Sequence, residues 1–149
     1  MDILPIDDNY FMKEALKEAN KAYQKDEVPI GAVLVCENKI IARAYSQTEL
    51  LHDVTAHAEI IAITSASNYL DSKYLNECTL YVTLEPCIMC AGAMMWSQLK
   101  QLVFGAHDEK RGFTGISKKI LHPATTCTGG ILEKECSFLL KDFFQSKRK

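Results

Sequence analysis

The sequence predicts a three-layer α/β/α protein with a central mixed sheet of about five strands, formed by one domain over residues 1–149. Helical and strand patterns alternate along the chain, which is typical of helices that cover both faces of a sheet. A chain of 149 residues is long enough to bury a sizeable core within a single domain. Apolar residues make up 48% and charged residues 24%, an ordinary balance for a globular protein.

Apolar spacing and turn residues place the elements along the chain. An apolar stripe at spacings of three and four predicts the first helix, which Asp7 or Asp8 caps and which ends before Pro29. The first strand is apolar almost throughout, so we expect it near the centre of the sheet. The segment 107–115 is polar and contains glycines, which predicts a flexible loop close to a functional site. The expected elements are helix 9–25, strands 30–36 and 39–45, loop 46–55, helix 56–68, strand 79–83, helix 87–96, strand 101–104, loop 107–115, an ambiguous segment 125–131 that can hold an edge strand, and helix 133–145.

The composition limits the cellular location and the binding partners that we expect. The net charge of −2 gives no global positive field, so an RNA partner would have to be held by local patches. No apolar run approaches the roughly 18 residues that a membrane span needs. The first residues are acidic where a signal peptide would be basic. We therefore expect a cytoplasmic protein with no membrane association.

The six cysteines are interpreted as metal ligands and free thiols rather than as a disulfide framework. Cys36, Cys78 and Cys136 lie in apolar or periodic surroundings, where a free thiol behaves as a small buried hydrophobe. A reducing cytosol would keep these thiols reduced. Cys127 lies in a threonine-rich stretch and receives no role.

A metal motif joins two separated stretches of the chain. Cys87 and Cys90 are three residues apart at the start of a predicted helix, so their thiols share one face. The positive end of a helix favours thiolates, which bind soft or borderline metals. The third ligand is expected to be His57, with Glu59 two residues further on. The combination of H-x-E and P-C-x-x-C is the signature of zinc-dependent deaminases.

The ligand count favours a catalytic site over a structural one. Structural zinc sites close with four protein ligands, whereas three ligands keep one position open for water. Zinc lowers the pKa of such a water to roughly 7. Glu59, on the first turn of the helix after His57, can take the water's proton and return it to a leaving amine. Hydrolytic deamination of an amidine-like ring carbon requires these two functions.

Simpler interpretations exist for each half of the motif. A lone C-x-x-C is often a redox pair or half of a zinc ribbon, but here Pro86 precedes it and no second C-x-x-C follows. A single histidine is usually an ordinary polar group, and His52, His107 and His122 are interpreted in that way. His57 differs because Glu59 and the cysteine pair complete a longer pattern.

Over nearly its whole length the chain resembles the bacterial tRNA-specific adenosine deaminases of the cytidine deaminase-like superfamily. The zinc motifs are typical of the superfamily, whereas the Cys-Ala-Gly-Ala and Phe-Gly-Ala segments favour the tRNA branch. The similar runs are Glu27-Val-Pro-Ile-Gly-Ala-Val-Leu-Val35, His52-Asp-Val-Thr-Ala-His-Ala-Glu59, Leu80-Tyr-Val-Thr-Leu-Glu-Pro-Cys-Ile-Met-Cys-Ala-Gly-Ala-Met94, Val103-Phe-Gly-Ala-His-Asp108, Gly130-Ile-Leu-Glu-Lys-Glu-Cys136 and Asp142-Phe-Phe144.

This resemblance implies a homodimer with one Zn²⁺ per subunit and a cytidine deaminase-like fold. The implied reaction converts the wobble adenosine of an arginine tRNA to inosine and releases ammonia. The backbone amides of residues 85–87 are expected to line the zinc pocket. The implied roles are zinc ligation by His57, Cys87 and Cys90, proton transfer by Glu59, and substrate contacts by Ser46, Pro29, Glu85 and Asp108.

One position departs from the family pattern. Ser46 stands where the family usually has an asparagine that hydrogen-bonds the substrate, and a hydroxyl cannot make the same pair of bonds as an amide. Either Gln47 or a water substitutes, or the substrate has changed. The alternative function is therefore deamination of a free nucleobase or nucleoside of the guanine, cytosine or cytidine type. A third alternative, an inactive zinc or tRNA-binding subunit, is disfavoured because Glu59 is present.

Contacts to RNA phosphates are expected from three basic segments, Lys110-Arg111 after Asp108, Lys118-Lys119 a few residues on, and Lys147-Arg148-Lys149 after the last helix. The basic tail also fits a solvated helix end that compensates the helix dipole. Phe144 can stack on a splayed base or belong to the core. The candidate RNA contacts are Lys110, Arg111, Phe144, Lys147 and Arg148.

Overall fold

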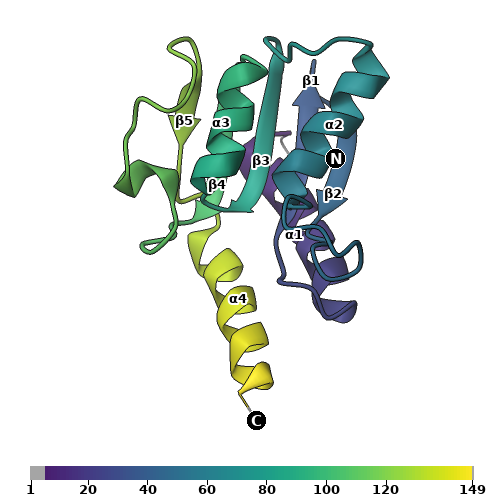
Figure 1. Cartoon of the computed structure of the whole chain (residues 1–149), viewed down its shortest axis with the longest axis vertical. Helices are drawn as coiled ribbons and strands as arrows, with labels where there is room; N and C mark the ends of the chain where they lie inside the picture. Colours follow the sequence, from purple (N-terminus) through teal and green to yellow (C-terminus); the bar gives the residue numbers. More distant parts are fainter. Residues whose placement is uncertain (1–5, 149) are drawn as a thin grey trace, which may run out of the picture.

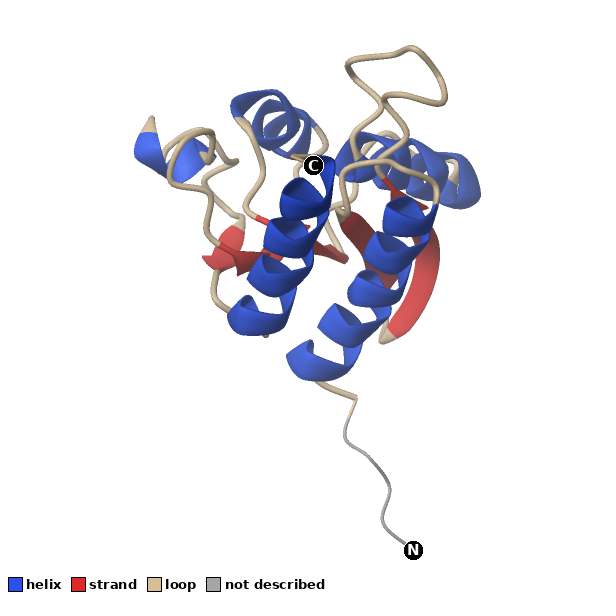
Figure 2. Cartoon of the chain, turned by 90° about the horizontal axis from the view of Figure 1, so that it is seen from below, coloured by secondary structure: helices blue, strands red, loops and turns tan. Residues whose placement is uncertain are grey.

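The computed structural model describes residues 6–148 and has the expected three layers. A mixed sheet in the order β2-β1-β3-β4-β5 lies between two layers of helices (Figures 1 and 2). The helices are α1 (Asp8–Gln24), α2 (Ala58–Leu70), α3 (Ile88–Trp96) and α4 (Glu133–Lys147), with a 3-10 turn at Phe113–Gly115. The strands are β1 (Gly31–Cys36), β2 (Lys39–Tyr45), β3 (Cys78–Leu84), β4 (Gln101–Ala106) and β5 (Thr126–Thr128).

The pairing of the strands gathers several chain segments at one end of the sheet. Strand β1 is antiparallel to β2 and β3, whereas β4 is parallel to β3 and β5. The start of β1 therefore lies at the same end of the sheet as the ends of β2, β3 and β4. In Figure 1 this end of the sheet points downward, and α4 extends beyond it. Helices α2 and α3 also begin there, so the loops that precede them lie at the same edge.

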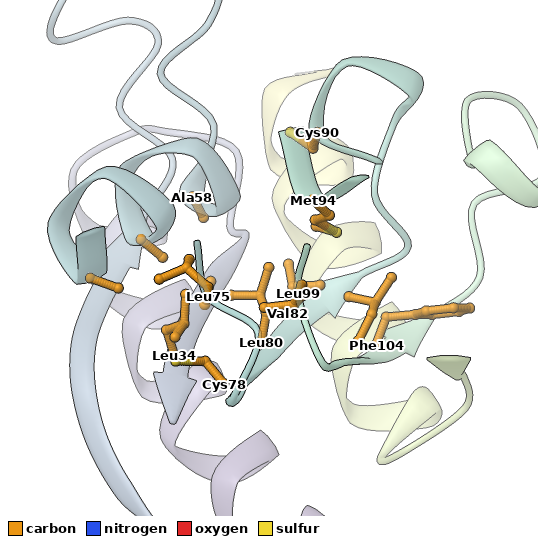
Figure 3. Packing of buried hydrophobic residues seen from close by; sticks show 14 of the residues in the cluster. Leu34, Ala58, Leu75, Cys78, Leu80, Val82, Cys90, Met94, Leu99 and Phe104 are labelled. Carbon is orange, nitrogen blue, oxygen red and sulfur yellow. The ribbon is translucent and has the colours of Figure 1, made fainter. Parts of the chain in front are cut away.

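Side chains alternate between the two faces of the sheet because successive residues of a strand point in opposite directions. On one face, Leu34, Leu80 and Val82 pack with residues of α2 and α3, as Figure 3 shows. On the other face, Val33 and Tyr81 pack with α1 and the start of α4. The first strand is buried from Gly31 to Val35, which confirms its predicted interior position.

The observed elements differ from the predicted ones mainly at their ends. Helices α2 and α3 begin at Ala58 and Ile88, because His57 and Cys87 have extended backbone conformations and serve as N-cap residues. The ambiguous segment before α4 contains the short edge strand β5. Of the described helices, none combines the length and apolar character needed to cross a bilayer.

The cysteines are free, as expected. Cys78 and Cys136 are buried, Cys36 is half-buried, and Cys127 is exposed on the edge strand.

Candidate metal centre

The metal motif is assembled where two helices begin at the same end of the sheet. The turn after β3 delivers Cys87 to the N-cap position of α3, and Cys90 follows one turn later. The loop after β2 delivers His57 to the N-cap position of α2. The two helices pack side by side on one face of the sheet (Figure 1). Residues that are thirty positions apart in sequence therefore face one another.

The distances between the ligand atoms fit a zinc ion. The Nδ1 atom of His57 lies 3.7 Å from Sγ of Cys87 and 3.5 Å from Sγ of Cys90. Tetrahedral geometry with ordinary Zn–N and Zn–S bond lengths requires about 3.6 Å between such atoms. All three ligand atoms lie within 4.8 Å of one another, and within residues 6–148 this metal-ligating cluster has only these members. The donor set therefore suits zinc with one position open.

The cysteines and the histidine influence one another's protonation. A hydrogen bond from Cys90, assisted by another from His57, lowers the pKa of Cys87 to about 3. The bond to Cys87 raises the pKa of His57, and the pKa of Cys90 is raised because it donates to Cys87 and is buried. The lowered pKa of Cys87 favours its thiolate, which is the form of cysteine that binds metals.

Glu59 is an acidic group whose charge acts on this cluster. Its side chain is 4% exposed, and its Oε1 atom is buried without a hydrogen-bond partner in the described part of the chain. Burial raises the pKa of Glu59 to about 7, although His57 partly opposes this effect. A buried acceptor without a partner is costly, so its retention indicates a role beyond stability. A carboxylate whose pKa is close to neutrality is suited to both accepting and donating a proton.

The residues predicted to contact substrate all come from the same end of the sheet. Pro29 precedes β1, Ser46 follows β2, Glu85 follows β3, and Asp108 follows β4. Ser46 is buried, and a backbone bond from Gln47 to Ala56 brings it close to the segment that carries His57.

The backbone N–H and the side-chain carboxylate of Glu85 both form hydrogen bonds within the protein. The backbone N–H of Glu85 donates to the carbonyl of Ala106, and its carboxylate accepts bonds from the loop that follows β4. A direct contact between Glu85 and the substrate, and an amide of Glu85 facing the metal, remain predictions. Asp108 accepts backbone N–H bonds from Lys110 and Arg111, so it shapes its own loop.

The candidate RNA contacts lie on two exposed segments. Lys110 and Arg111 are exposed on the loop after β4, and Lys147 is exposed and pairs with Asp26. Phe144 is 45% exposed and belongs to the rim of the core rather than to its interior. It lines a cavity of about 290 Å³ with His107 and Arg148, beside the ends of β3 and β4. An aromatic ring and a cation thus lie together near the candidate site.

Sequence reasoning missed two residues that shape the site. Glu27 is buried and accepts backbone N–H bonds from Glu49 and Leu50 in the loop before His57. Thr114 donates both its N–H and its hydroxyl to Glu85. An acidic residue two positions before Pro29 was the only available signal for Glu27, and nothing local in the sequence identifies its partners.

Comparison with known proteins agrees with this geometry. The family described as the cytidine and deoxycytidylate deaminase zinc-binding region matches residues 5–106. The tRNA-specific adenosine deaminase of Bacillus subtilis (strain 168) is 47% identical over 95% of this chain and 91% of its own length.

Solved structures of deaminases are also similar to this chain. A structure from a study of A-to-I editing by tRNA:A34 deaminases superposes with a TM-score of 0.83 at 43% identity, covering 88% of this chain and 99% of that one. A guanine deaminase from Bacillus subtilis is 33% identical with a TM-score of 0.65, and the match covers 76% of each chain. The chain belongs to the zinc-binding deaminase family and, within it, to the tRNA-specific adenosine deaminases.

Proposed function

We propose that this protein is a zinc-dependent hydrolase that converts the wobble adenosine of a tRNA anticodon to inosine and releases ammonia. The observation that carries this proposal is the cluster of His57, Cys87 and Cys90 with an unpartnered carboxylate oxygen of Glu59 beside it. The high identity to tRNA-specific adenosine deaminases supports the substrate class. The proposal also includes an arginine tRNA as the substrate, which the resemblance implies, and the cytoplasm as the location, which the composition predicts.

In this proposal each residue of the site has a defined role. His57, Cys87 and Cys90 would hold zinc, and a bound zinc ion would supply a nucleophilic hydroxide at neutral pH. Glu59 takes a proton from the attacking water at Oε1 and delivers it to the departing amino group. Burial raises the pKa of Glu59 to about 7. Ser46, Pro29 and Asp108 contact the adenosine and its neighbours, while Lys110, Arg111, Phe144, Lys147 and Arg148 contact the RNA strand.

The test uses zinc-loaded protein and an arginine tRNA that carries adenosine at the wobble position. Inosine at that position, together with an equal amount of ammonia, is the expected product. Absence of inosine from protein that contains one zinc per chain would refute the proposal.

Ser46 favours a second candidate function, deamination of a free nucleobase or nucleoside. Its hydroxyl offers fewer hydrogen bonds than an asparagine amide. A guanine deaminase also shares the fold at 33% identity. Parallel assays with guanine, cytosine, cytidine and the tRNA distinguish the two functions: turnover of a small molecule with the tRNA left unchanged would establish the second.

We also propose that the protein is a homodimer, and the outer face of α2 and α3 is the surface that supports it. Trp96 is 76% exposed and Ile88 52% exposed on α3, and Tyr69 is 62% exposed on α2. Where exposed apolar groups form one contiguous patch, they mark a contact surface. Sedimentation analysis should show a dimer, and Trp96→Glu should shift it toward monomer. A wild-type monomer at micromolar concentration would contradict this assignment.

A further inference from the structure

The carboxylate of Glu85 ties the loop after β4 to the turn that carries the metal ligands. Glu85 is 4% exposed, and its Oε1 atom accepts the backbone N–H of Asp108 at 3.0 Å. Its Oε2 atom accepts the N–H of Thr114 at 3.0 Å and the Thr114 hydroxyl at 2.5 Å. These donors are at the two ends of the segment 108–114. One carboxylate therefore fixes the whole loop, two residues before the ligand Cys87.

The same loop is packed directly on the carboxylate. A Cβ atom added to Gly112 would lie 2.3 Å from Cδ of Glu85, which is a closer approach than real atoms make. The N–H of Phe113 also donates to the carbonyl of Pro86 at 2.9 Å. Glycine is thus required for the loop to lie on Glu85. The exposed side chains of this loop are those of Glu109, Lys110 and Arg111, so two of the three are cationic.

Glu27 forms a similar arrangement on the other loop at this end of the sheet. Its side chain is 2% exposed, and its two oxygens accept the N–H of Glu49 at 3.0 Å and of Leu50 at 2.7 Å. The loop that it holds connects β2 with α2 and ends at the ligand His57. The exposed side chains of this loop include three apolar ones, since Leu50 is 61%, Leu51 53% and Val54 83% exposed. The polar side chains of Glu49, His52, Asp53 and Thr55 are exposed beside them.

We propose that Glu85 and Glu27 are positioning residues, each of which holds one substrate-facing loop beside the metal centre. Within residues 6–148 neither carboxylate forms an ion pair, so the bonds from the loops are what compensate its burial. A glutamine cannot replace either residue, because its NH₂ group would face an N–H donor. The loop held by Glu85 presents cations to the RNA phosphates, and the loop held by Glu27 presents apolar surface to the bases. The RNA contacts rest on the proposed function, whereas the loop anchoring does not.

Amide hydrogen exchange of the zinc-loaded protein tests the anchoring directly, with each variant as the control for the other. In Glu85→Gln, the amides of Asp108 and Thr114 should exchange about tenfold faster or more, and those of Glu49 and Leu50 should stay within about twofold. In Glu27→Gln the pattern should be reversed. A tenfold change corresponds to about 1.4 kcal/mol, near the lower limit for a hydrogen bond to a charged group.

Two milder variants keep the test decisive if Glu85→Gln fails to fold. Gly112→Ala retains the carboxylate but separates the loop from it, and Thr114→Val removes only the hydroxyl donor. Both should accelerate exchange at Asp108 without affecting Leu50, with the smaller change in Thr114→Val. Unchanged exchange, or equal acceleration in both loops, would overturn the anchoring role.

Binding of an RNA stem-loop with adenosine at the wobble position tests the substrate-facing role. Glu85→Gln should weaken the affinity about tenfold, while the zinc content stays at one ion per chain. If amide exchange is faster only in the loop that the mutated residue holds, while the RNA affinity is unchanged, the proposed contact with RNA is overturned and the anchoring role stands. Failure of the wild-type protein to form inosine would count against the proposed function alone.

Discussion

Replacement of Glu59 by glutamine tests the chemistry of the site most directly. The variant keeps the shape of the side chain and removes its ability to carry a proton. General acid–base catalysis contributes about 10²- to 10⁴-fold to a rate, equivalent to about 2.7–5.5 kcal/mol. The other titratable groups at the cluster are the three ligands, so no neighbour can take over the proton transfer. We therefore expect a loss near the upper limit, about 10⁴-fold.

The assay is single-turnover formation of inosine with zinc-loaded protein, accompanied by metal analysis. Zinc should remain at one ion per chain, because Glu59 is not among the ligands. The melting temperature should not fall by more than about 3 °C, the shift that about 1 kcal/mol produces in a chain of this size. Glu133→Gln, which changes an exposed carboxylate bonded to His107, is the matched control. A rate within tenfold of wild type, or loss of zinc with activity, would refute the assigned role.

Three further changes have defined outcomes. Removal of zinc by a chelator should abolish activity and lower the melting temperature in calorimetry, since a ligand at about a thousand times its Kd adds about 4 kcal/mol; zinc, but not magnesium, should restore both. Gly31→Ala should lower the free energy of unfolding by about 1–3 kcal/mol in urea, because the new Cβ would lie 2.1 Å from the carbonyl oxygen of Ala15, whereas Gly115→Ala meets no neighbour within 4 Å. Hydrogen bonds from Lys17 and Arg43 lower the pKa of Glu14 from 4.5, so Glu14→Gln should be less stable than wild type at pH 7, and the difference should disappear as the pH falls below 4.5.

Local sequence patterns were sufficient for most of the fold. Long periodic segments such as the first helix were placed within one residue, because their apolar spacing reports directly on which face is buried. The bounds of α2 were less accurate, by two residues at each end, and at its start His57 caps the helix with extended backbone rather than with a side-chain bond. The edge strand β5 stayed ambiguous because three exposed residues carry no alternation of burial.

The metal ligands could be identified because their chemistry is visible in the spacing of the chain. Two thiols on one helical turn, and a histidine followed two residues later by an acid, form local patterns that few other structures produce. The anchoring bonds of Glu27 and Glu85 leave no such pattern. They join residues that are 22 and 29 positions apart, and their partners are mostly backbone N–H groups, which every residue except proline possesses.

The buried glutamates of this protein show how environment, rather than residue type, assigns function. Glu14 and Glu18 are compensated by cations, and Glu27 and Glu85 by N–H donors from the loops that they hold. Glu59 alone keeps a buried oxygen without a partner in the described chain. A carboxylate whose oxygens all accept hydrogen bonds has no free position for a proton that is being transferred. Glu59 has such a position at Oε1. Because these five buried residues are all glutamates, only the hydrogen bonds of the folded chain separate the residue that moves a proton from those that hold the site in place.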